Sequence, residues 1–447
     1  MNGADHDTIH IVGAGPVGTL LALLLAQRGR RVHLHERRAD PRVSAPERGR
    51  SINLALATRG LRALEAAGAL ERIRPGMVPM TGRMLHEGSG ETRLLRYGQR
   101  ADEVIWSISR ADLNRELVRL AGEQPLIGMS FNQHCIDADA ERSRLRFQGS
   151  AANAEHEVAA GIIIGADGAG SAVRQAMAAR DLCQASEEPL AHDYKELHLT
   201  ADAAGRHRME PHALHVWPRG EFMLIALPNH DGSFTATLFL PREGAASFAR
   251  LDNVARVHEF FTAQFPDVLP LLPDLAAQFA AHPRGELATL HCWPWHAGNM
   301  LLIGDAAHAI VPFHGQGLNC GFEDCLVLDA LLANQPDAAQ AFARFEAERR
   351  INTDAIAQMA LENYHEMRDT VRSPDFERRK QLGNALERLY PDRFIPRYSM
   401  VMFHPGISYV DALQRGIAQE RLLDVLLAQG IDPDSALARQ LLFEAAL

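Results

Sequence analysis

The first residues with chemical promise are three glycines and one acid near the start of the chain. Gly13, Gly15 and Gly18 follow a short apolar run, and Glu36 comes 18 residues after the last of them. In a strand–turn–helix–strand unit such glycines permit a tight turn, close approach of a pyrophosphate and close packing of helix on strand. The acid can accept hydrogen bonds from a ribose diol. This spacing predicts a dinucleotide site, and the acid favours FAD or NAD over NADP, whose 2′-phosphate suits a basic residue.

Two aspartates also stand where buried strands should end. Asp167 lies in a Gly-Ala-Asp-Gly turn after residues 157–165, which we expect to form one buried strand. Asp305 lies in a Gly-Asp-Ala-Ala-His turn after residues 299–303. Either aspartate alone could simply cap a helix. Ligands of open α/β sheets bind at the carboxyl ends of strands, so the two turns together indicate contacts to the ribityl and phosphate part of FAD.

A further glycine turn contains Gly315, Gln316 and Gly317 at the start of an expected helix. Its backbone amides and the helix dipole would face the edge of a flavin where negative charge develops on reduction. Since all these turns follow in order along the chain, they predict one extended FAD rather than separate helix caps.

The remaining pattern places these turns in an α/β fold. Alternating strands between about residues 190 and 290 indicate a separate antiparallel sheet, and residues 80–97 read as a hairpin that joins another sheet. Ser109 followed by Asp112 is a capping box that opens a helix. We expect a Rossmann-like FAD-binding domain (residues 1–75, 101–180 and 285–335), a mainly antiparallel substrate domain (residues 76–100 and 181–284) and a C-terminal helical region (residues 336–447).

Composition narrows the class of protein. The 447 residues carry a net charge of −10, which argues against nucleic-acid binding. Five scattered cysteines without a CxxC pair predict no metal site and no disulfide framework, and therefore a reducing cytoplasm. The first expected strand begins almost at the start of the chain, so we expect no signal peptide. No apolar run approaches the roughly 20 residues of a membrane-spanning helix, so we expect no membrane anchor.

The glycine turns together resemble the class A flavoprotein aromatic hydroxylases, whose fold is that of p-hydroxybenzoate hydroxylase. These FAD monooxygenases take hydride from a reduced nicotinamide without a second nucleotide-binding fold, and no second GxGxxG occurs here. Longer stretches resemble the kynurenine 3-monooxygenase family within that class, over about residues 8–405. The stretches are residues 49–56, 106–110, 194–197, 226–229, 233–239, 312–319, 363–367 and 396–400.

The resemblance implies site residues. A carboxylate of the substrate would be held by Arg83, Tyr97 and Tyr398, with Asn363 and Met367 beside it. The slot for the aromatic ring would be formed by Ile225, Phe239, Pro312, Phe313 and His314. The contacts to FAD would be made by Gly13, Gly15, Gly18, Glu36, Arg110, Asp167, Asp305, Gly315, Gln316, Gly317, Leu318 and Asn319.

The resemblance also implies an activity, the hydroxylation of L-kynurenine to 3-hydroxykynurenine with NADPH or NADH and O₂, through a C4a-hydroperoxyflavin, in tryptophan degradation. The aryl amine already activates the ring, so no catalytic acid or base is expected. His314 is the one titratable candidate, and we expect it to order its loop. The slot must orient the ring and exclude water.

Two alternatives stay open at this point. A class A hydroxylase of another aromatic acid would share the FAD turns and differ at Arg83, Asn363 and Tyr398. A flavin-binding interaction protein without turnover would share the turns as well. Flavin-dependent halogenation is rejected, because Trp293 and Trp295 begin a WxWxIP motif that is not completed. A monomer and a homodimer are both compatible with the sequence.

Overall fold

The computed structural model describes residues 8–44, 53–149, 154–335, 337–367 and 374–445. Residues 49–52, the first part of one family-like stretch, lie outside this description. The strands are β1 (Ile9–Val12), β2 (Val32–His35), β3 (Asn53–Leu56), β4 (Val78–Met80), β5 (Gly82–His86), β6 (Thr92–Arg96), β7 (Ile105–Ser109), β8 (Ile127–Ser130), β9 (Gln133–Asp139), β10 (Arg144–Gly149), β11 (Glu155–Ala159), β12 (Ile162–Gly165), β13 (Gln184–Leu199), β14 (Ala213–Pro218), β15 (Met223–Pro228), β16 (Phe234–Pro241), β17 (Arg284–Trp293), β18 (His296–Ala297) and β19 (Met300–Leu302).

Helices cover the sheets and form the C-terminal region. The α-helices are α1 (Pro16–Gln27), α2 (Thr58–Ala66), α3 (Leu70–Ile73), α4 (Arg110–Gly122), α5 (Ala172–Ala178), α6 (Val254–Gln264), α7 (Leu275–Ala281), α8 (Asp305–His308), α9 (Gly317–Asn334), α10 (Ala338–His365), α11 (Pro374–Leu389), α12 (Arg397–Phe403), α13 (Tyr409–Gln429) and α14 (Ala436–Glu444). Short 3-10 helices are η1 (Arg74–Gly76), η2 (Phe248–Arg250), η3 (Leu269–Leu271) and η4 (Pro312–His314).

The central sheet has six strands in the order β18-β19-β12-β1-β2-β8. β1 pairs in parallel with β12 on one side and with β2 on the other, and β12 pairs in parallel with β19. Parallel strands of such sheets are buried on both faces, which explains the continuous apolar runs. Their carboxyl ends lie at one edge, so the predicted turns after β1, β12 and β19 meet there. This confirms the Rossmann-like fold.

The expected single strand at residues 157–165 is wrong. β11 ends at Ala159 and lies mostly exposed in a three-stranded antiparallel sheet, β11-β10-β9, whereas β12 begins at Ile162 in the buried central sheet. β11 begins with three consecutive exposed polar residues, whereas the apolar run of β12 belongs to a strand buried on both faces. The three-stranded sheet was not predicted from the sequence.

A seven-stranded sheet, in the order β17-β13-β16-β15-β14-β5-β6, corresponds to the separate, mainly antiparallel sheet that the sequence predicts. Its pairs are antiparallel except for β14 with β5. The hairpin β5–β6 joins this sheet, as the sequence predicted. β17 continues in this sheet to Trp293, and β4 pairs with β7 in a separate three-stranded sheet, so the domain boundaries near residues 76 and 285 stay predictions.

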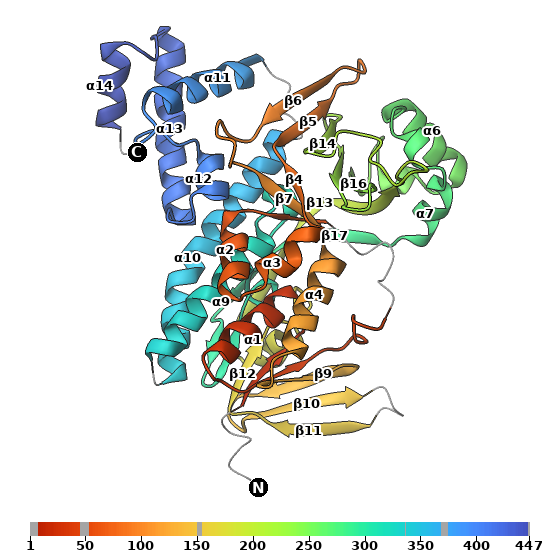
Figure 1. The fold of residues 1–447 in the computed structure, drawn as a ribbon, viewed down its shortest axis with the longest axis vertical. Coiled ribbons are helices and arrows are strands. Elements are labelled where there is room, and N and C mark those ends of the chain that lie inside the picture. Colours follow the sequence, from red (N-terminus) through yellow and green to blue (C-terminus); the bar gives the residue numbers. More distant parts are fainter. Residues whose placement is uncertain (1–7, 45–52, 150–153, 336, 368–373, 446–447) are drawn as a thin grey trace.

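The C-terminal region is helical and lies against both domains. Figure 1 shows α11 to α14 gathered beside the β5–β6 hairpin, at the end of the molecule opposite the β9–β11 sheet. Arg93 on β6 reaches Glu377 on α11 at 2.6 Å. The expected proline-marked break falls between α11 and α12. No helix in the described residues is long and apolar enough to cross a membrane.

Three histidines stack beneath the nucleotide edge. His10 on β1 lies opposite His33 on β2, and His35 follows two residues later on the same face. His10 Nδ1 and His35 Nε2 are 3.0 Å apart, and the Phe147 ring covers His35 with ring centroids 4.4 Å apart. Burial, together with the neighbouring histidines, lowers the pKa of His35 to about 2. His35 is therefore uncharged at neutral pH.

This stack predicts loss of stability in mild acid. His35 has a pKa of about 2 when folded and 6.5 as its ordinary value, so the unfolded chain binds more protons below pH 6.5. Between pH 7.5 and 5.5 the free energy of unfolding should fall by about 1.4 kcal/mol from His35 alone. Urea unfolding of the apoprotein at both pH values measures this. The His35→Phe variant should lose that part of the pH dependence, and an unchanged dependence would contradict the assignment.

Candidate active site

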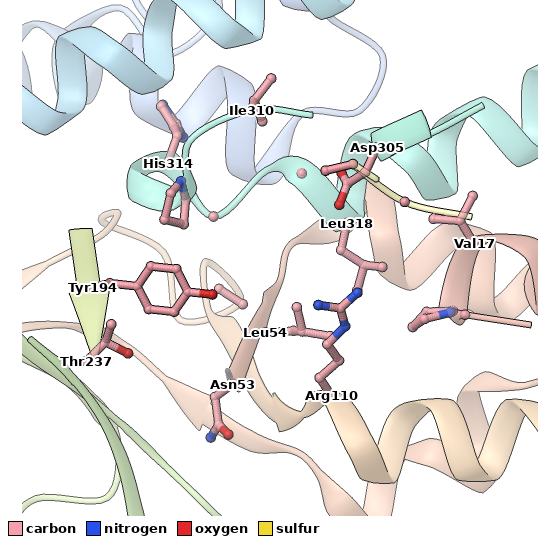
Figure 2. A pocket seen from close by; sticks show the side chains of 18 of the residues that line it. Val17, Asn53, Leu54, Arg110, Tyr194, Thr237, Asp305, Ile310, His314 and Leu318 are labelled. Atoms are coloured by element: carbon pink, nitrogen blue, oxygen red, sulfur yellow. The ribbon is translucent and has the colours of Figure 1, made fainter. Parts of the chain in front are cut away.

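A cavity of about 560 Å³ opens between the carboxyl edge of the central sheet and the seven-stranded sheet. Residues from all three expected regions line it. Figure 2 shows Arg110, Asp305 and Val17 on one side and Tyr194 and Thr237 on the other. The volume lies in the range of small-molecule and cofactor sites. The sequence-predicted turns and the predicted ring slot therefore face one shared cavity.

The first glycine turn has the geometry that the sequence predicts. Gly13 has φ +105°, and a Cβ there would lie 2.4 Å from the carbonyl oxygen of Ala166. A Cβ at Gly18 would lie 2.1 Å from the carbonyl oxygen of Gly13, so helix and strand pack backbone to backbone. At Gly15, by contrast, a Cβ would meet no atom within 4 Å. The space beside Gly15 is open to the cavity, as a bound pyrophosphate requires.

The polar groups around this turn suit FAD. Helix α1 begins without a side-chain cap, which leaves its first amides for an anion. Glu36 accepts hydrogen bonds from the amides of Ala14 (3.0 Å) and Arg38 (2.9 Å), which hold its carboxylate at the cavity. Carboxylate oxygens have lone pairs to spare for ribose hydroxyls. These residues fit the adenosine and pyrophosphate parts of FAD.

Asp167 is both a helix cap and a cavity group. Its Oδ2 accepts the amides of Ala172 (2.7 Å) and Val173 (3.3 Å) at the start of α5. Its Oδ1 is buried without a hydrogen-bond partner and faces the cavity. Burial raises the pKa of this carboxyl. A buried oxygen without a partner costs free energy, and a donor on FAD would remove that cost.

Asp305 and Arg110 line the same side of the cavity, and Figure 2 shows Leu318 between them. Asp305 follows Gly304, whose φ of +56° and ψ of −143° suit only glycine. Gly315 is left-handed at φ +65°, and α9 then opens at Gly317 without a side-chain cap. The amides at this helix start are thus free for a ligand.

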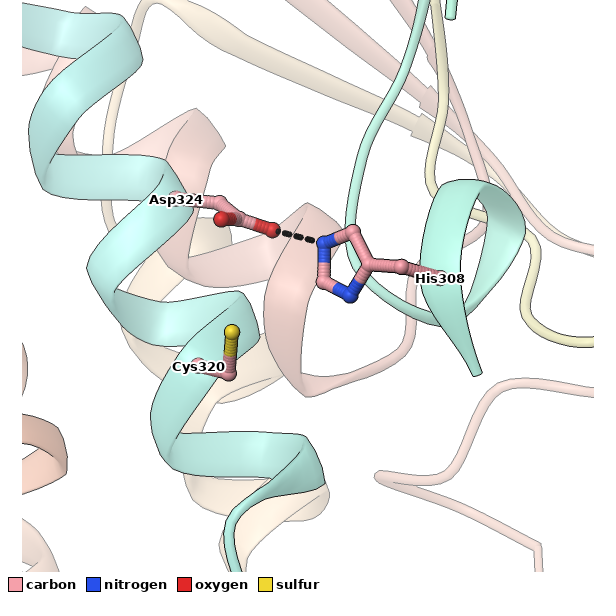
Figure 3. A group of neighbouring side chains, drawn as sticks. All are labelled: His308, Cys320 and Asp324. Atoms are coloured by element: carbon pink, nitrogen blue, oxygen red, sulfur yellow. Dashed lines mark hydrogen bonds and ion pairs between the residues drawn. The ribbon is translucent and has the colours of Figure 1, made fainter. Parts of the chain in front are cut away.

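Behind the Gly304 turn lies a cluster of potential metal ligands, His308, Cys320 and Asp324 (Figure 3). Asp324 Oδ2 accepts hydrogen bonds from His308 Nε2 (2.7 Å) and the Gly304 amide (3.1 Å). Its Oδ1 accepts one from Arg349 Nε at 2.7 Å. Burial raises the pKa of the Cys320 thiol, which keeps it protonated and a poor ligand. The Arg349 guanidinium supplies a positive charge beside Asp324, and the cluster supports the Gly304 turn.

At the opposite end of the cavity, Arg83 lies beside two stacked tyrosines. The Arg83 Cζ lies 5.0 Å from the ring centroid of Tyr398 and 5.9 Å from that of Tyr97, and the two rings stack at 5.6 Å. Arg83 Nη1 lies 3.8 Å from the Glu366 carboxylate, and its Nε is buried without a partner. Burial raises the pKa of both tyrosines, so their phenols remain donors. The arrangement is complementary to a carboxylate.

The ring slot lies beside this group. Phe239 and Phe313 have ring centroids 4.9 Å apart, and Ile225, Pro312 and Met367 also line the cavity. The His314 ring stacks on Tyr398 at 5.2 Å, and burial lowers the pKa of His314 to about 3. His314 is therefore neutral at physiological pH.

Four predicted residues do not line the cavity. Gly18 packs beneath the first turn, and Gln316 is turned towards Tyr409, whose hydroxyl lies 2.8 Å from Gln316 Oε1. Asn319 binds the backbone of Ala55, Ala57 and Gly315. Asn363 donates to the carbonyl oxygen of Phe313 at 2.5 Å. Contacts of these four with a ligand stay predictions. The side chains of Gln316, Asn319 and Asn363 hold loops that do line the cavity.

Other cavity residues were not predicted. Tyr194 and Asn53 occur in the family-like stretches without an assigned role. Thr237 follows strand alternation, since it lies two residues before Phe239 on the same strand face. That alternation is the signal that could have identified it. Residues of the β9 strand also line the cavity at its nucleotide end, namely Gln133, His134 and Cys135.

Comparison with known proteins agrees with this geometry. Residues 5–360 match the family model described as FAD binding domain. The chain is 48% identical over 429 residues to a kynurenine 3-monooxygenase of Stenotrophomonas maltophilia (strain K279a), covering 96% of this chain and 93% of the relative. It is 45% identical over 427 residues to the kynurenine 3-monooxygenase of Myxococcus xanthus (strain DK1622), covering 95% and 92%.

Solved structures show the same fold at lower identity. The tetrameric form of 2-methyl-3-hydroxypyridine-5-carboxylic acid oxygenase matches with a TM-score of 0.67 and 22% identity, over 82% of this chain and 94% of that one. A p-nitrophenol 4-monooxygenase from Pseudomonas putida DLL-E4 matches with a TM-score of 0.66 and 19% identity, over 85% and 93%. At this identity the likeness shows the fold alone.

The cluster in Figure 3 predicts that a residue outside the cavity controls FAD affinity. In the Asp324→Asn variant the Gly304 turn loses its charged acceptor, and Arg349 keeps only one of its two carboxylate partners, Glu323, so the turn that carries Asp305 is held less firmly. The Kd for FAD, measured by fluorescence titration of the apoprotein, should rise about tenfold or more, as expected for a lost charge-assisted hydrogen bond.

A matched control lies on the same helix. Asp329 is a buried carboxylate of α9 that pairs with Arg28 at 2.9 Å. Asp329→Asn should leave the Kd for FAD within about twofold, because Asp329 pairs with Arg28 and shares no hydrogen-bond partner with Asp324 or the Gly304 turn. Equal Kd values for the two variants would contradict the role of Asp324.

Proposed function

The chain belongs to the kynurenine 3-monooxygenase family of FAD-binding proteins, and from that premise we propose that its cavity hydroxylates L-kynurenine beside the aryl amine. The protein is an FAD-dependent aromatic monooxygenase. NADPH is the proposed electron donor and O₂ the second substrate. The product is 3-hydroxykynurenine.

One observation carries the choice of substrate. Arg83, flanked by Tyr97 and Tyr398, is buried at the end of the cavity that contains the ring slot. Among the described residues, the carboxylate that pairs with this buried guanidinium stands at 3.8 Å, so an anion from the ligand would stabilise it. Kynurenine carries such a carboxylate on a short chain attached to an aromatic ketone. The cavity thus offers an anion site and an apolar slot in the right order.

The residues proposed to hold FAD follow four strands of the central sheet, β1, β2, β12 and β19, with Arg110 added from the start of α4. The open amides at Gly15 and the α1 start suit the pyrophosphate, Glu36 the ribose, and Asp167, Asp305 and Arg110 the ribityl chain and ring system. Bound FAD supplies the reduction chemistry that activates O₂.

The protein's own residues then orient the substrate and keep it dry. Arg83 and the tyrosines fix the carboxylate, and the Phe239–Phe313 pair confines the ring. His314 is uncharged and stacks on Tyr398, which agrees with a wall residue rather than a base. The aryl amine activates the ring itself, so positioning and exclusion of water are the contributions required of the protein.

We also propose a cytoplasmic location and a monomeric or homodimeric state. All five cysteines are buried free thiols, which supports a reducing compartment. Size-exclusion chromatography with light scattering measures the oligomeric state.

Steady-state turnover tests the function. The FAD-loaded protein should oxidise NADPH several-fold faster with L-kynurenine than with p-hydroxybenzoate, and 3-hydroxykynurenine should form in near-equal amount to NADPH consumed. Stimulation by p-hydroxybenzoate instead would favour a phenolic-acid hydroxylase. FAD binding without stimulation by either compound would favour a protein without turnover.

Removing the guanidinium should weaken substrate binding selectively. Arg83→Ala is expected to raise the KM for L-kynurenine about 100-fold, in line with the loss of a charged hydrogen-bonded contact, while the FAD content stays near one per chain. The absorbance ratio of flavin to protein and the KM are the two measurements.

Arg93 provides the control on the same hairpin. It pairs with Glu377 at the surface, outside the cavity, and both side chains are more than a third exposed. Arg93→Ala should leave KM unchanged, because exposed ion pairs contribute little. An unchanged KM in the Arg83 variant would remove Arg83 from the carboxylate site.

A further inference from the structure

Thr237 carries a polar atom that nothing in the described residues satisfies. It lies on β16, only 1% exposed, and its Oγ1 is buried without a hydrogen-bond partner. The side chain lines the cavity, and Figure 2 shows it beside Tyr194 on the wall formed by the seven-stranded sheet. A buried hydroxyl without a partner costs on the order of 1–3 kcal/mol, so most are paired. The orphaned hydroxyl indicates a ligand group at this place.

Thr237 has both polar and apolar neighbours, since on one side it pairs with the buried Glu196 of β13. Strand alternation puts Thr237 and Phe239 on one face, and Thr237 pairs directly with Ile225 on β15. Met223, opposite Phe239, lines the same cavity wall. On this wall the Thr237 hydroxyl lies near two other polar side chains, Tyr194, which also lines the cavity, and the buried Glu196. Two other atoms near this end of the cavity have no hydrogen-bond partner among the described residues, Arg83 Nε and His314 Nδ1. Both belong to the carboxylate end, because the His314 ring stacks on Tyr398, beside Arg83.

The proposed substrate has one hydrogen bond to offer here. In an ortho-aminophenyl ketone, one N–H of the aryl amine bonds the ketone oxygen within the molecule. The second N–H is free, and burial in an apolar slot would leave it unsatisfied. The free N–H of the substrate's ring amine is thus complementary to the unpaired Thr237 oxygen on the wall.

We propose that Thr237 Oγ1 accepts the hydrogen bond of the substrate's aryl amine and selects aromatic amines for this cavity. The inference rests on the proposed function. A ring held only through its carboxylate chain could rotate by half a turn and present its other edge. A second contact at the amine fixes which edge faces the flavin side, so Thr237 determines orientation as well as specificity.

Equilibrium binding tests the proposal. Anaerobic calorimetry of the FAD-loaded protein, without NADPH, compares L-kynurenine with its analogue lacking the aryl amine, 2-amino-4-oxo-4-phenylbutanoate. The unmodified protein should bind L-kynurenine about tenfold more tightly than the analogue, the effect of one hydrogen bond. In Thr237→Val, which keeps the shape but lacks the hydroxyl, the two affinities should be equal. In Thr237→Ser the tenfold preference should return.

Thr235→Val is the matched control. Thr235 lies on the same strand and face, but its Oγ1 donates to Asn53 Oδ1 at 3.0 Å and accepts from Asn229 Nδ2 at 3.2 Å. This variant should lose stability and keep the tenfold preference. Thr237→Val should retain or gain stability, because it removes an unpaired hydroxyl. Urea unfolding of both apoproteins gives this second readout without any ligand.

The outcomes separate the two levels of inference. If Thr237→Val keeps the full preference for L-kynurenine, or is destabilised as much as Thr235→Val, the role of Thr237 is overturned while the proposed function stands. If the unmodified protein binds neither compound, the proposed function falls, and the role of Thr237 falls with it.

Discussion

The fold depends on backbone atoms in direct contact where β1 turns into α1. Gly18 lies against the carbonyl of Gly13, and Gly13 lies against the backbone of Ala166 at the end of β12. Any side chain at either glycine would separate helix from strand, or β1 from its neighbour. Because the two strands end together, the amide at Gly15, the Glu36 carboxylate and the Asp167 carboxylate reach one space. Close packing at two glycines thus gathers polar groups from three distant segments.

Much of this arrangement can be predicted from interactions between residues that are close in sequence. The glycine turn, the buried strands that precede it and the Ser109 cap of α4, with its hydroxyl accepting the Asp112 amide at 3.4 Å, are set by neighbours in sequence. The hairpin of β5 and β6 likewise follows from alternation and a turn. The sequence pattern did not separate β11 from β12, because the apolar run of β12 follows it almost directly. The pairing of β11 with β10 in another sheet is not visible in that run. Strand pairing is decided by distant residues, which a local pattern does not contain.

The direction in which a side chain points is the second property that the sequence pattern does not predict. Spacing located the loop of Gln316 and Asn319, but not that both amides would turn away from the cavity to hold backbone and helix. Thr237 could have been placed on the cavity face by alternation. That its hydroxyl has no partner depends on what every neighbouring strand offers, and is visible only in the assembled sheet. Most of the residues that the family resemblance names line the cavity, and the packing decides which of them line it and which of them support its loops.

The walls of the cavity have a consequence for synthesis of the chain. Its lining begins at Val12 and ends at Met402 on α12, and the strand that carries the Gly304 turn is the last of the parallel strands to be made. A ribosome therefore releases the first glycine turn long before β19 can complete the sheet around it. The wall that shields the ring slot closes only when α12 has left the exit tunnel. Until then the apolar part of the cavity lacks one of its walls, so the cavity is complete only after most of the chain has been made.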